Sequence, residues 1–172
     1  MNAYQQARQL LPKMPEEVFR LWFDGRIQAN GWPPVGPAWL GALRYKPFGL
    51  WQQLEWEKRM VGLDLDRFTS GARHIIHGLI QANFMGRHNV YSRTLGDSKE
   101  RMAKILEYVR TRRSLPGALI LLEDSGSYEI VDGSHRLAVL FFVLADGQTK
   151  DLLETDHEAW CGFLPGQQSI PR

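Results

Sequence analysis

The chain has 172 residues, enough for one domain with a full hydrophobic core. Apolar residues make up 44% of the sequence, and six Trp and eight Phe argue against a disordered protein. The formal net charge of +2 neither requires nor excludes a nucleic-acid partner. A single cysteine, Cys161, excludes an internal disulfide framework.

Neither export nor membrane insertion is expected. The first 14 residues, MNAYQQARQLLPKM, lack the apolar core of a signal peptide. The longest apolar run, residues 137–145, is too short to cross a bilayer. We therefore expect a cytoplasmic protein without a membrane partner.

Residues 1–60 are rich in aromatic side chains, and we assign them to an N-terminal extension. Pro15, followed by two glutamates, predicts the start of a helix, because proline suits the first turn and acids suit its positive end. Residues 30–41, NGWPPVGPAWLG, predict a packed loop. We expect the aromatic side chains to form core; the alternative is a substrate or partner surface, with Trp22, Trp32 and Trp39 shaping an acceptor pocket.

Residues 61–150 are predicted to form the main folded unit. Residues 63–68, LDLDRF, alternate in polarity and predict a short strand. Thr69 or Ser70 would cap a helix that runs to about residue 84. Asp97 and Glu100 resemble a capping box and predict a second helix, which ends in the basic RTRRSLP segment.

A hairpin and a buried helix complete this unit. Residues 117–124 read as a strand, SGS as a tight turn and YEIVDG as the return strand. From Ser134 a helix that is apolar on nearly all sides is expected to run to about Asp146. We assign residues 151–172 to a C-terminal tail that packs on the core. This order of elements predicts an α+β fold with a mixed sheet.

The residues DGSHR stand between the return strand and this helix. With Ser134 at the cap, the first helical amides have no internal partner and carry the positive end of the helix dipole. Gly133 allows a ligand close to the backbone, and Ser134, His135 and Arg136 offer a hydroxyl, an imidazole and a guanidinium fork. The pattern predicts a phosphate site, at which Asp132 would hold Mg²⁺ or orient a hydroxyl nucleophile. The alternative is a capped helix with a surface arginine and a hydrogen-bonded histidine.

The segment VDGSHRLAVL, following a hairpin, resembles the signature turn of the ParB/sulfiredoxin superfamily. Members of that superfamily carry a DG-x-HR-x-A type of turn between a strand and a helix, preceded by a helix, a proline and a strand. The same order is present in YSRTLGDSKERMAKILEYVRTRRSLPGALILLED. The resemblance covers about a third of the chain, residues 91–147.

The resemblance implies a nucleotide site, in which the turn wraps the phosphates of ATP, ADP or CTP. Gly133, Ser134, His135 and Arg136 would then contact phosphate, and Asp132 matches the acid before the glycine in the free-serine kinases of the superfamily. Sulfiredoxins have their catalytic cysteine where this chain has serine, so sulfinic-acid repair is not expected. Only 25 residues follow position 147, so the DNA-binding and dimerisation domains of chromosome-partitioning ParB proteins are not expected either.

Two further groups are candidates for ligand contacts. The segment before the second helix contains His88, Tyr91, Ser92 and Arg93, and in this superfamily that segment often reaches the nucleotide or substrate. The alternative is an ordinary polar loop. The basic residues at positions 110, 112 and 113 form either a solvated helix end or a contact with a phosphate backbone.

These observations lead us to expect a kinase that uses ATP or ADP with Mg²⁺ to phosphorylate a small hydroxylated metabolite. Asp132 and His135 would be its catalytic residues, with Asp132 as the magnesium ligand. One alternative is a ParB-like nuclease or ATPase, or a plasmid- or phage-borne inhibitory protein that retains the nucleotide site. Another is a nucleotide-sensing module that binds a protein through its aromatic residues. A nucleic-acid partner is not favoured, and the oligomeric state is left open.

Overall fold

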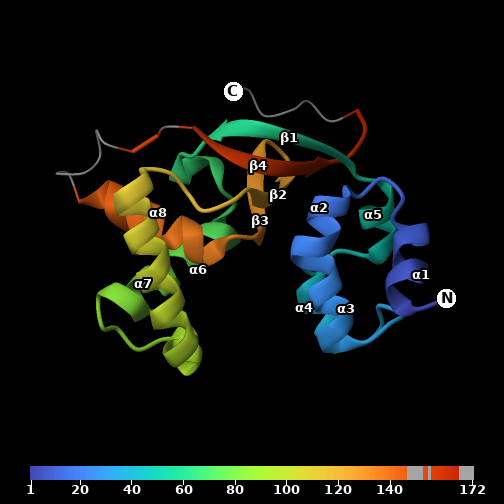
Figure 1. Cartoon of the computed structure of the whole chain (residues 1–172), viewed down its shortest axis with the longest axis horizontal. Coiled ribbons are helices and arrows are strands. Elements are labelled where there is room, and N and C mark those ends of the chain that lie inside the picture. Colours follow the sequence, from blue (N-terminus) through green and yellow to red (C-terminus); the bar gives the residue numbers. More distant parts are fainter. Residues whose placement is uncertain (147–152, 155, 167–172) are drawn as a thin grey trace.

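The computed structural model describes residues 1–146, 153–154 and 156–166, without the side chains of residues 93–97. A four-stranded sheet lies between two groups of helices, which extend from it as separate lobes (Figure 1). The α+β class predicted from the sequence is confirmed. Within the described residues, no helix is both long enough and apolar enough to span a membrane.

The N-terminal lobe is built from short helical segments: α1 (Ala3–Leu10), α2 (Glu16–Val18), the π-helical turn η1 (Phe19–Phe23), α3 (Asp24–Asn30), α4 (Pro37–Ala42) and α5 (Phe48–Gln53). The helix predicted to start at Pro15 is present, with Pro15 at its N-cap. The predicted loop, residues 30–41, contains the start of α4, which has its proline in the first turn.

The C-terminal lobe contains longer helices: α6 (Ser70–Phe84), α7 (Leu95–Arg112) and α8 (Ser134–Ala145), with the 3₁₀ turns η2 (Leu65–Arg67) and η3 (Val90–Thr94). Thr69 caps α6 as predicted, because its side chain accepts a hydrogen bond from the amide of Ala72 at 3.2 Å. The helix predicted near Asp97 is also present, but it begins earlier, at Leu95, and the Asp97 side chain lies outside the described residues.

The sheet has the order β1-β4-β2-β3, formed by β1 (Glu55–Gly62), β4 (Asp156–Phe163), β2 (Leu119–Asp124) and β3 (Ser127–Asp132). Strand β4 is antiparallel to β1 and parallel to β2, and the β2–β3 hairpin is antiparallel. The hairpin matches the sequence prediction. Residues 156–163, which fall in the expected C-terminal tail, instead form an interior strand of the sheet.

The strand predicted at residues 63–68 is wrong. The side chain of Asp64 accepts a hydrogen bond from the amide of Asp66 at 3.0 Å, and this local bond starts the 3₁₀ turn η2. The alternation of apolar residues arises because Leu63 and Leu65 pack against the core from a turn. The neighbouring strand β1 lies before this segment and was not predicted.

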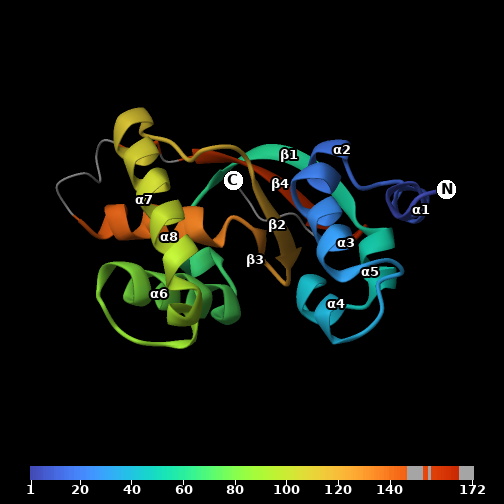
Figure 2. The same ribbon diagram turned by 60° about the horizontal axis from the view of Figure 1, so that its bottom comes forward.

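Successive residues of β2 separate the two cores on opposite faces of the sheet. Leu119 and Leu121 point into a cluster with α6, α7 and α8, which we call the aliphatic face. Ile120 and Leu122 point into a cluster with the N-terminal lobe, which we call the aromatic face. The two lobes therefore cover opposite faces of one sheet (Figures 1 and 2).

Candidate functional site

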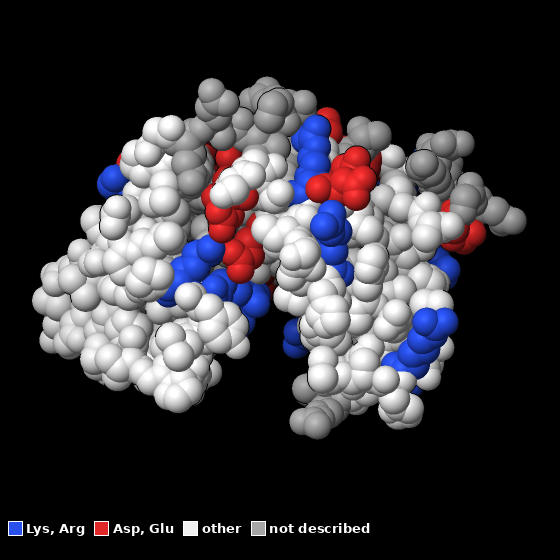
Figure 3. All heavy atoms as spheres, turned by 180° about the vertical axis from the view of Figure 1, so that it is seen from behind, with Lys and Arg blue, Asp and Glu red and all other residues white. Residues whose placement is uncertain are grey.

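A cleft with a volume of about 510 Å³ lies between the two lobes. The space-filling view from behind shows the hollow between them (Figure 3). The cleft is lined by residues from both lobes: Glu17 and Leu21 near the start of the N-terminal lobe, Arg101 and Ile105 of α7, Pro116, Gly117 and Ala118 before β2, and Asp132, Gly133, Ser134, His135 and Arg136. The structure thus brings the whole predicted DGSHR turn to one cavity.

Gly133 forms the N-cap of α8, with a φ of 106° in the left-handed region. A Cβ atom at this position would lie 2.5 Å from Cδ2 of Leu119, so both the backbone angle and the space require glycine. The prediction that Ser134 caps the helix is wrong. Ser134 is the first helical residue and no side chain caps α8, because the left-handed Gly133 occupies the N-cap position.

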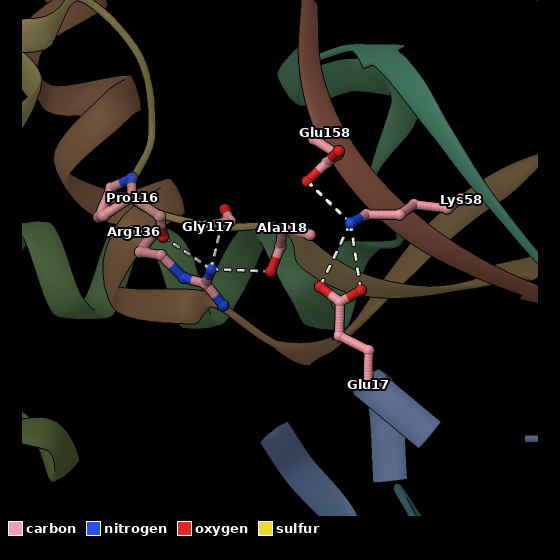
Figure 4. A network of polar contacts seen from close by, with 7 residues as sticks. All are labelled: Glu17, Lys58, Pro116, Gly117, Ala118, Arg136 and Glu158. Atoms are coloured by element: carbon pink, nitrogen blue, oxygen red, sulfur yellow. Dashed lines mark hydrogen bonds and ion pairs between the residues drawn. The ribbon is translucent and has the colours of Figure 1, made fainter. Parts of the chain in front are cut away.

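Arg136 is held by protein groups. Its Nη1 donates to the carbonyl oxygens of Pro116, Gly117 and Ala118 at 3.1, 3.1 and 2.8 Å, as Figure 4 shows. Its Nη2 donates to Oδ2 of Asp132 at 2.7 Å. These bonds tie the start of α8 to the segment that enters β2. The guanidinium fork that the sequence offers to phosphate is therefore directed largely at carbonyl oxygens.

His135 and Arg101 face the cleft from neighbouring helices. Burial, together with the positive charge of Arg101, lowers the pKa of His135 below its ordinary value, and the charge of Asp132 partly opposes this. The imidazole is therefore neutral near pH 7 and can donate one hydrogen bond. Arg101 is exposed, and within the described part of the chain no ion pair neutralises it. It is the cation of the cleft most available to a ligand.

A chain of ion pairs fixes the opposite wall. Nζ of Lys58, on β1, lies 3.1 Å from Oε2 of Glu17 and 3.2 Å from Oε2 of Glu158 on β4 (Figure 4). These contacts raise the pKa of Lys58, with the hydrogen bond to Glu17 as the largest cause. The network connects the start of the N-terminal lobe to the sheet and places the Glu17 carboxylate at the cleft.

The second predicted group lies elsewhere. His88, Tyr91 and Ser92 are not among the residues that line the cleft, and the Arg93 side chain lies outside the described residues. The Tyr91 ring packs onto Gly78 of α6, at a place where any larger residue would collide with it. Ser92 Oγ accepts a hydrogen bond from the amide of Asn89 at 3.0 Å. These contacts describe a segment that docks on α6.

The residues of the cleft also include some that the sequence did not indicate. Glu17 and Leu21 are distant from the DGSHR turn in the sequence and carry no motif. Trp22 and Trp39, for which core was expected and an acceptor pocket was the alternative, are buried in the aromatic face and do not line the cleft. Arg101 and Ile105 lie on α7, a helix that was predicted. The sequence did not indicate that α7 packs beside the DGSHR turn. Within the described residues, no group of three or more His, Cys, Asp or Glu could hold a metal ion.

Comparison of the chain with protein-family models, with curated proteins and with solved structures found no match. The candidate site therefore rests on its own geometry and on the resemblance of its turn.

Proposed function

We propose that the protein binds a nucleotide by its phosphates at the Gly133 turn and transfers a phosphoryl group to a small hydroxylated molecule in the cleft. The observation that carries the proposal is that the N-terminus of α8, a buried helix of 12 residues, opens into a cleft of about 510 Å³. The first amides of a helix have no helical partner and attract anions. The resemblance to the ParB/sulfiredoxin superfamily supports ATP or ADP as the nucleotide.

The phosphate contacts would come from the first turn of α8 and from α7. The amides of Ser134 and His135, the Ser134 hydroxyl and the neutral imidazole would donate hydrogen bonds to phosphate oxygens. Arg101 would supply the positive charge, because it is exposed and unpaired by other described residues. Arg136 acts as a positioning residue that holds the turn through carbonyl oxygens and Asp132.

Asp132 would act on the acceptor. It would take the proton of the acceptor hydroxyl as the oxygen bonds to the terminal phosphorus and the bond from that phosphorus to its bridging oxygen breaks. The leaving nucleotide keeps the electron pair of that bond. Mg²⁺ is commonly held by one or two carboxylates together with substrate phosphates. In this turn, Asp132 would be the carboxylate ligand. When bound, the ion would offset phosphate charge.

Calorimetry with ADP, in the absence of metal, tests the phosphate site. Arg101→Ala should weaken binding by about 1.5–3 kcal/mol, the contribution of a charged hydrogen bond. Lys99→Ala, which removes an exposed cation from another side of α7, is the matched control and should leave binding unchanged. Equal affinities in wild type and Arg101→Ala would contradict the phosphate site.

Transfer from labelled ATP to a panel of amino acids, sugars and nucleosides tests the chemistry. Asp132→Asn should bind ADP without metal as well as wild type or better, because a negative charge is removed beside an anion. Its transfer rate should fall by about 10²–10⁴, the range for removal of a general base. Unchanged transfer by this variant would refute the role of Asp132, and cleavage of nucleic acid without any acceptor would favour the nuclease alternative.

A further inference from the structure

A line of exposed side chains runs along α7 away from the cleft. Arg101, Tyr108 and Arg112 lie within about 40° of one another around the helix axis, at about 100° per residue, and Lys104 lies beside them. All four are exposed, and Tyr108 retains 40% of its surface. We call these four residues the α7 stripe. It begins at the cleft, which Arg101 lines.

The stripe borders a second hollow. A groove of about 260 Å³ is lined by Lys104, Glu107, Tyr108, Thr111 and Arg112. Helix α7 packs across α8 (Figure 2), and the residues that line this groove are all exposed. The tyrosine ring is therefore held beside an open groove and between two cations.

The charges of the stripe are accessible to a ligand. Lys104 pairs with Glu100 at 2.7 Å, but both side chains are more than two-thirds exposed, and such a pair exchanges readily with other anions. No ion pair within the described residues neutralises Arg101 or Arg112. Glu107 is the acidic residue that lines the groove.

We propose that a single-stranded nucleic acid binds along the α7 stripe, with one end directed toward the cleft. The cations would contact the phosphates, and a base would stack on the ring of Tyr108. The stripe is roughly 16 Å long at about 1.5 Å per residue, which is enough for a few nucleotides of a single strand. The binding needs no phosphoryl transfer. It shares Arg101 with the proposed nucleotide site, whereas Lys104, Tyr108 and Arg112 lie outside the cleft.

The side chains favour a nucleic acid over other polyanions. Tyr108 is the one large apolar side chain exposed among the described residues of α7, so an anionic lipid surface would find a single anchor. An acidic peptide would satisfy the cations and leave the aromatic ring without a stacking partner. A strand of nucleotides engages both, because each unit carries a phosphate and a flat base.

Fluorescence anisotropy with labelled oligo-dT and oligo-U strands of about 12 nucleotides tests this interaction. Arg112→Glu should weaken binding about tenfold or more. Arg110→Glu, on the opposite side of α7, changes the net charge equally and should have less than about a twofold effect. Tyr108→Ala should weaken binding about fivefold or more. The slope of log affinity against log salt should flatten by about 0.7 for each phosphate that a variant no longer neutralises.

Equal weakening by Arg110→Glu and Arg112→Glu would overturn the proposal, since it would indicate unspecific charge attraction. Binding of polyglutamate or anionic vesicles with the same dependence on Arg112 and Tyr108 would also overturn it. Calorimetry with ADP on Arg112→Glu separates the two sites: nucleotide binding in the cleft should be unchanged. ADP binding by Arg101→Ala tests the nucleotide site in the cleft. The nucleic-acid site is tested by strand binding of the Tyr108→Ala and Arg112→Glu variants.

Discussion

The two faces of the sheet are built in different ways. On the aliphatic face, helices of 12 to 18 residues pack branched side chains against the strands. On the aromatic face, helices of six to eight residues, and one helix that runs without a break from α2 through η1 to α3, gather around large rings. Isolated helices of six to eight residues are not stable, so these depend on tertiary contacts. The candidate cleft lies where the two kinds of construction meet.

The tryptophans emphasise this contrast, because all six belong to the aromatic face. The rings of Trp22 and Trp51 lie 4.7 Å apart, and Trp39 lies 5.4 Å from Phe23. The indole N–H of Trp39 donates to the carbonyl of Gly31 at 3.0 Å. Those of Trp22 and Trp51 are buried and have no acceptor within the described part of the chain, which costs stability. Ring packing must offset that cost.

The aliphatic face contains a buried charge pair instead. Arg59 of β1 reaches across β4 to Glu123 of β2, and their side chains are only 8% and 3% exposed. Cys161 lies between them on β4, where burial raises the pKa of its thiol to about 11. The pair links two strands that are not neighbours and so favours the insertion of β4 between them.

Breaking this pair should have a large effect. Glu123→Gln leaves the buried Arg59 charge with only the half-exposed Glu57 as a carboxylate partner among the described residues, at 3.3 Å, and should lower the free energy of unfolding by about 3 kcal/mol, measured by urea denaturation. A double variant, Arg59→Met with Glu123→Leu, should recover most of the loss, because it removes both charges. A single variant as stable as wild type would show that the pair does not contribute to stability.

Some elements of this fold could be predicted from the sequence, and others could not. Helix α6 and the β2–β3 hairpin were predictable, because periodicity, a capping threonine and a short turn are local signals. Strand β4 was not, since its inclusion in the sheet depends on pairing with β1 and β2 far along the chain. In the cleft, the DGSHR turn was predictable as a group. The bonds from Arg136 to three carbonyls and the arrival of Arg101 result from packing that no motif encodes.

A pair of neighbouring leucines compares the faces directly. Leu121 is buried in the aliphatic face and Leu122 in the aromatic face, so each Leu→Ala change creates a cavity on one side. Each should cost about 2–5 kcal/mol in urea unfolding. Only Leu122→Ala should shift the tryptophan emission of the folded protein to longer wavelength. An equal shift in Leu121→Ala would show that the two faces are not separately packed.

The Gly133 turn can be tested against a second glycine of the same hairpin region. Gly133→Ala should cost about 1–3 kcal/mol and abolish ADP binding, because it adds a collision with Leu119 to an unfavourable backbone angle. Gly126 also has a positive φ, of 81°, but open space around it, so Gly126→Ala should cost only the backbone part, about 1–2 kcal/mol. Equal losses of stability and retained binding in both variants would contradict a specific role for Gly133.

The smallest expected effect is the dependence of stability on pH, which should arise from histidines in the C-terminal part of the chain. All five histidines lie after residue 73, and burial lowers the pKa of both His135 and His157. A histidine with a lowered pKa in the folded state leaves stability intact above about pH 6.5, and stability falls as the pH drops from there toward the folded-state pKa. Urea unfolding between pH 7 and 5.5 should therefore show decreasing stability, and His135→Gln should remove part of that decrease while His157 retains the rest.

Bound ADP should act in the opposite direction on His135, because a phosphate in the cleft favours the charged imidazole. A histidine NMR titration should give an apparent pKa for His135 below 6.5 without ligand and a higher one with ADP. The pKa of His157, on β4 and outside the cleft, should not respond to ADP and serves as the internal control. Tryptophan emission from the aromatic face should stay constant over the same pH range in the folded protein. If the pKa of His135 did not change with ADP, the residue would be buried in the cleft without contacting the bound phosphate.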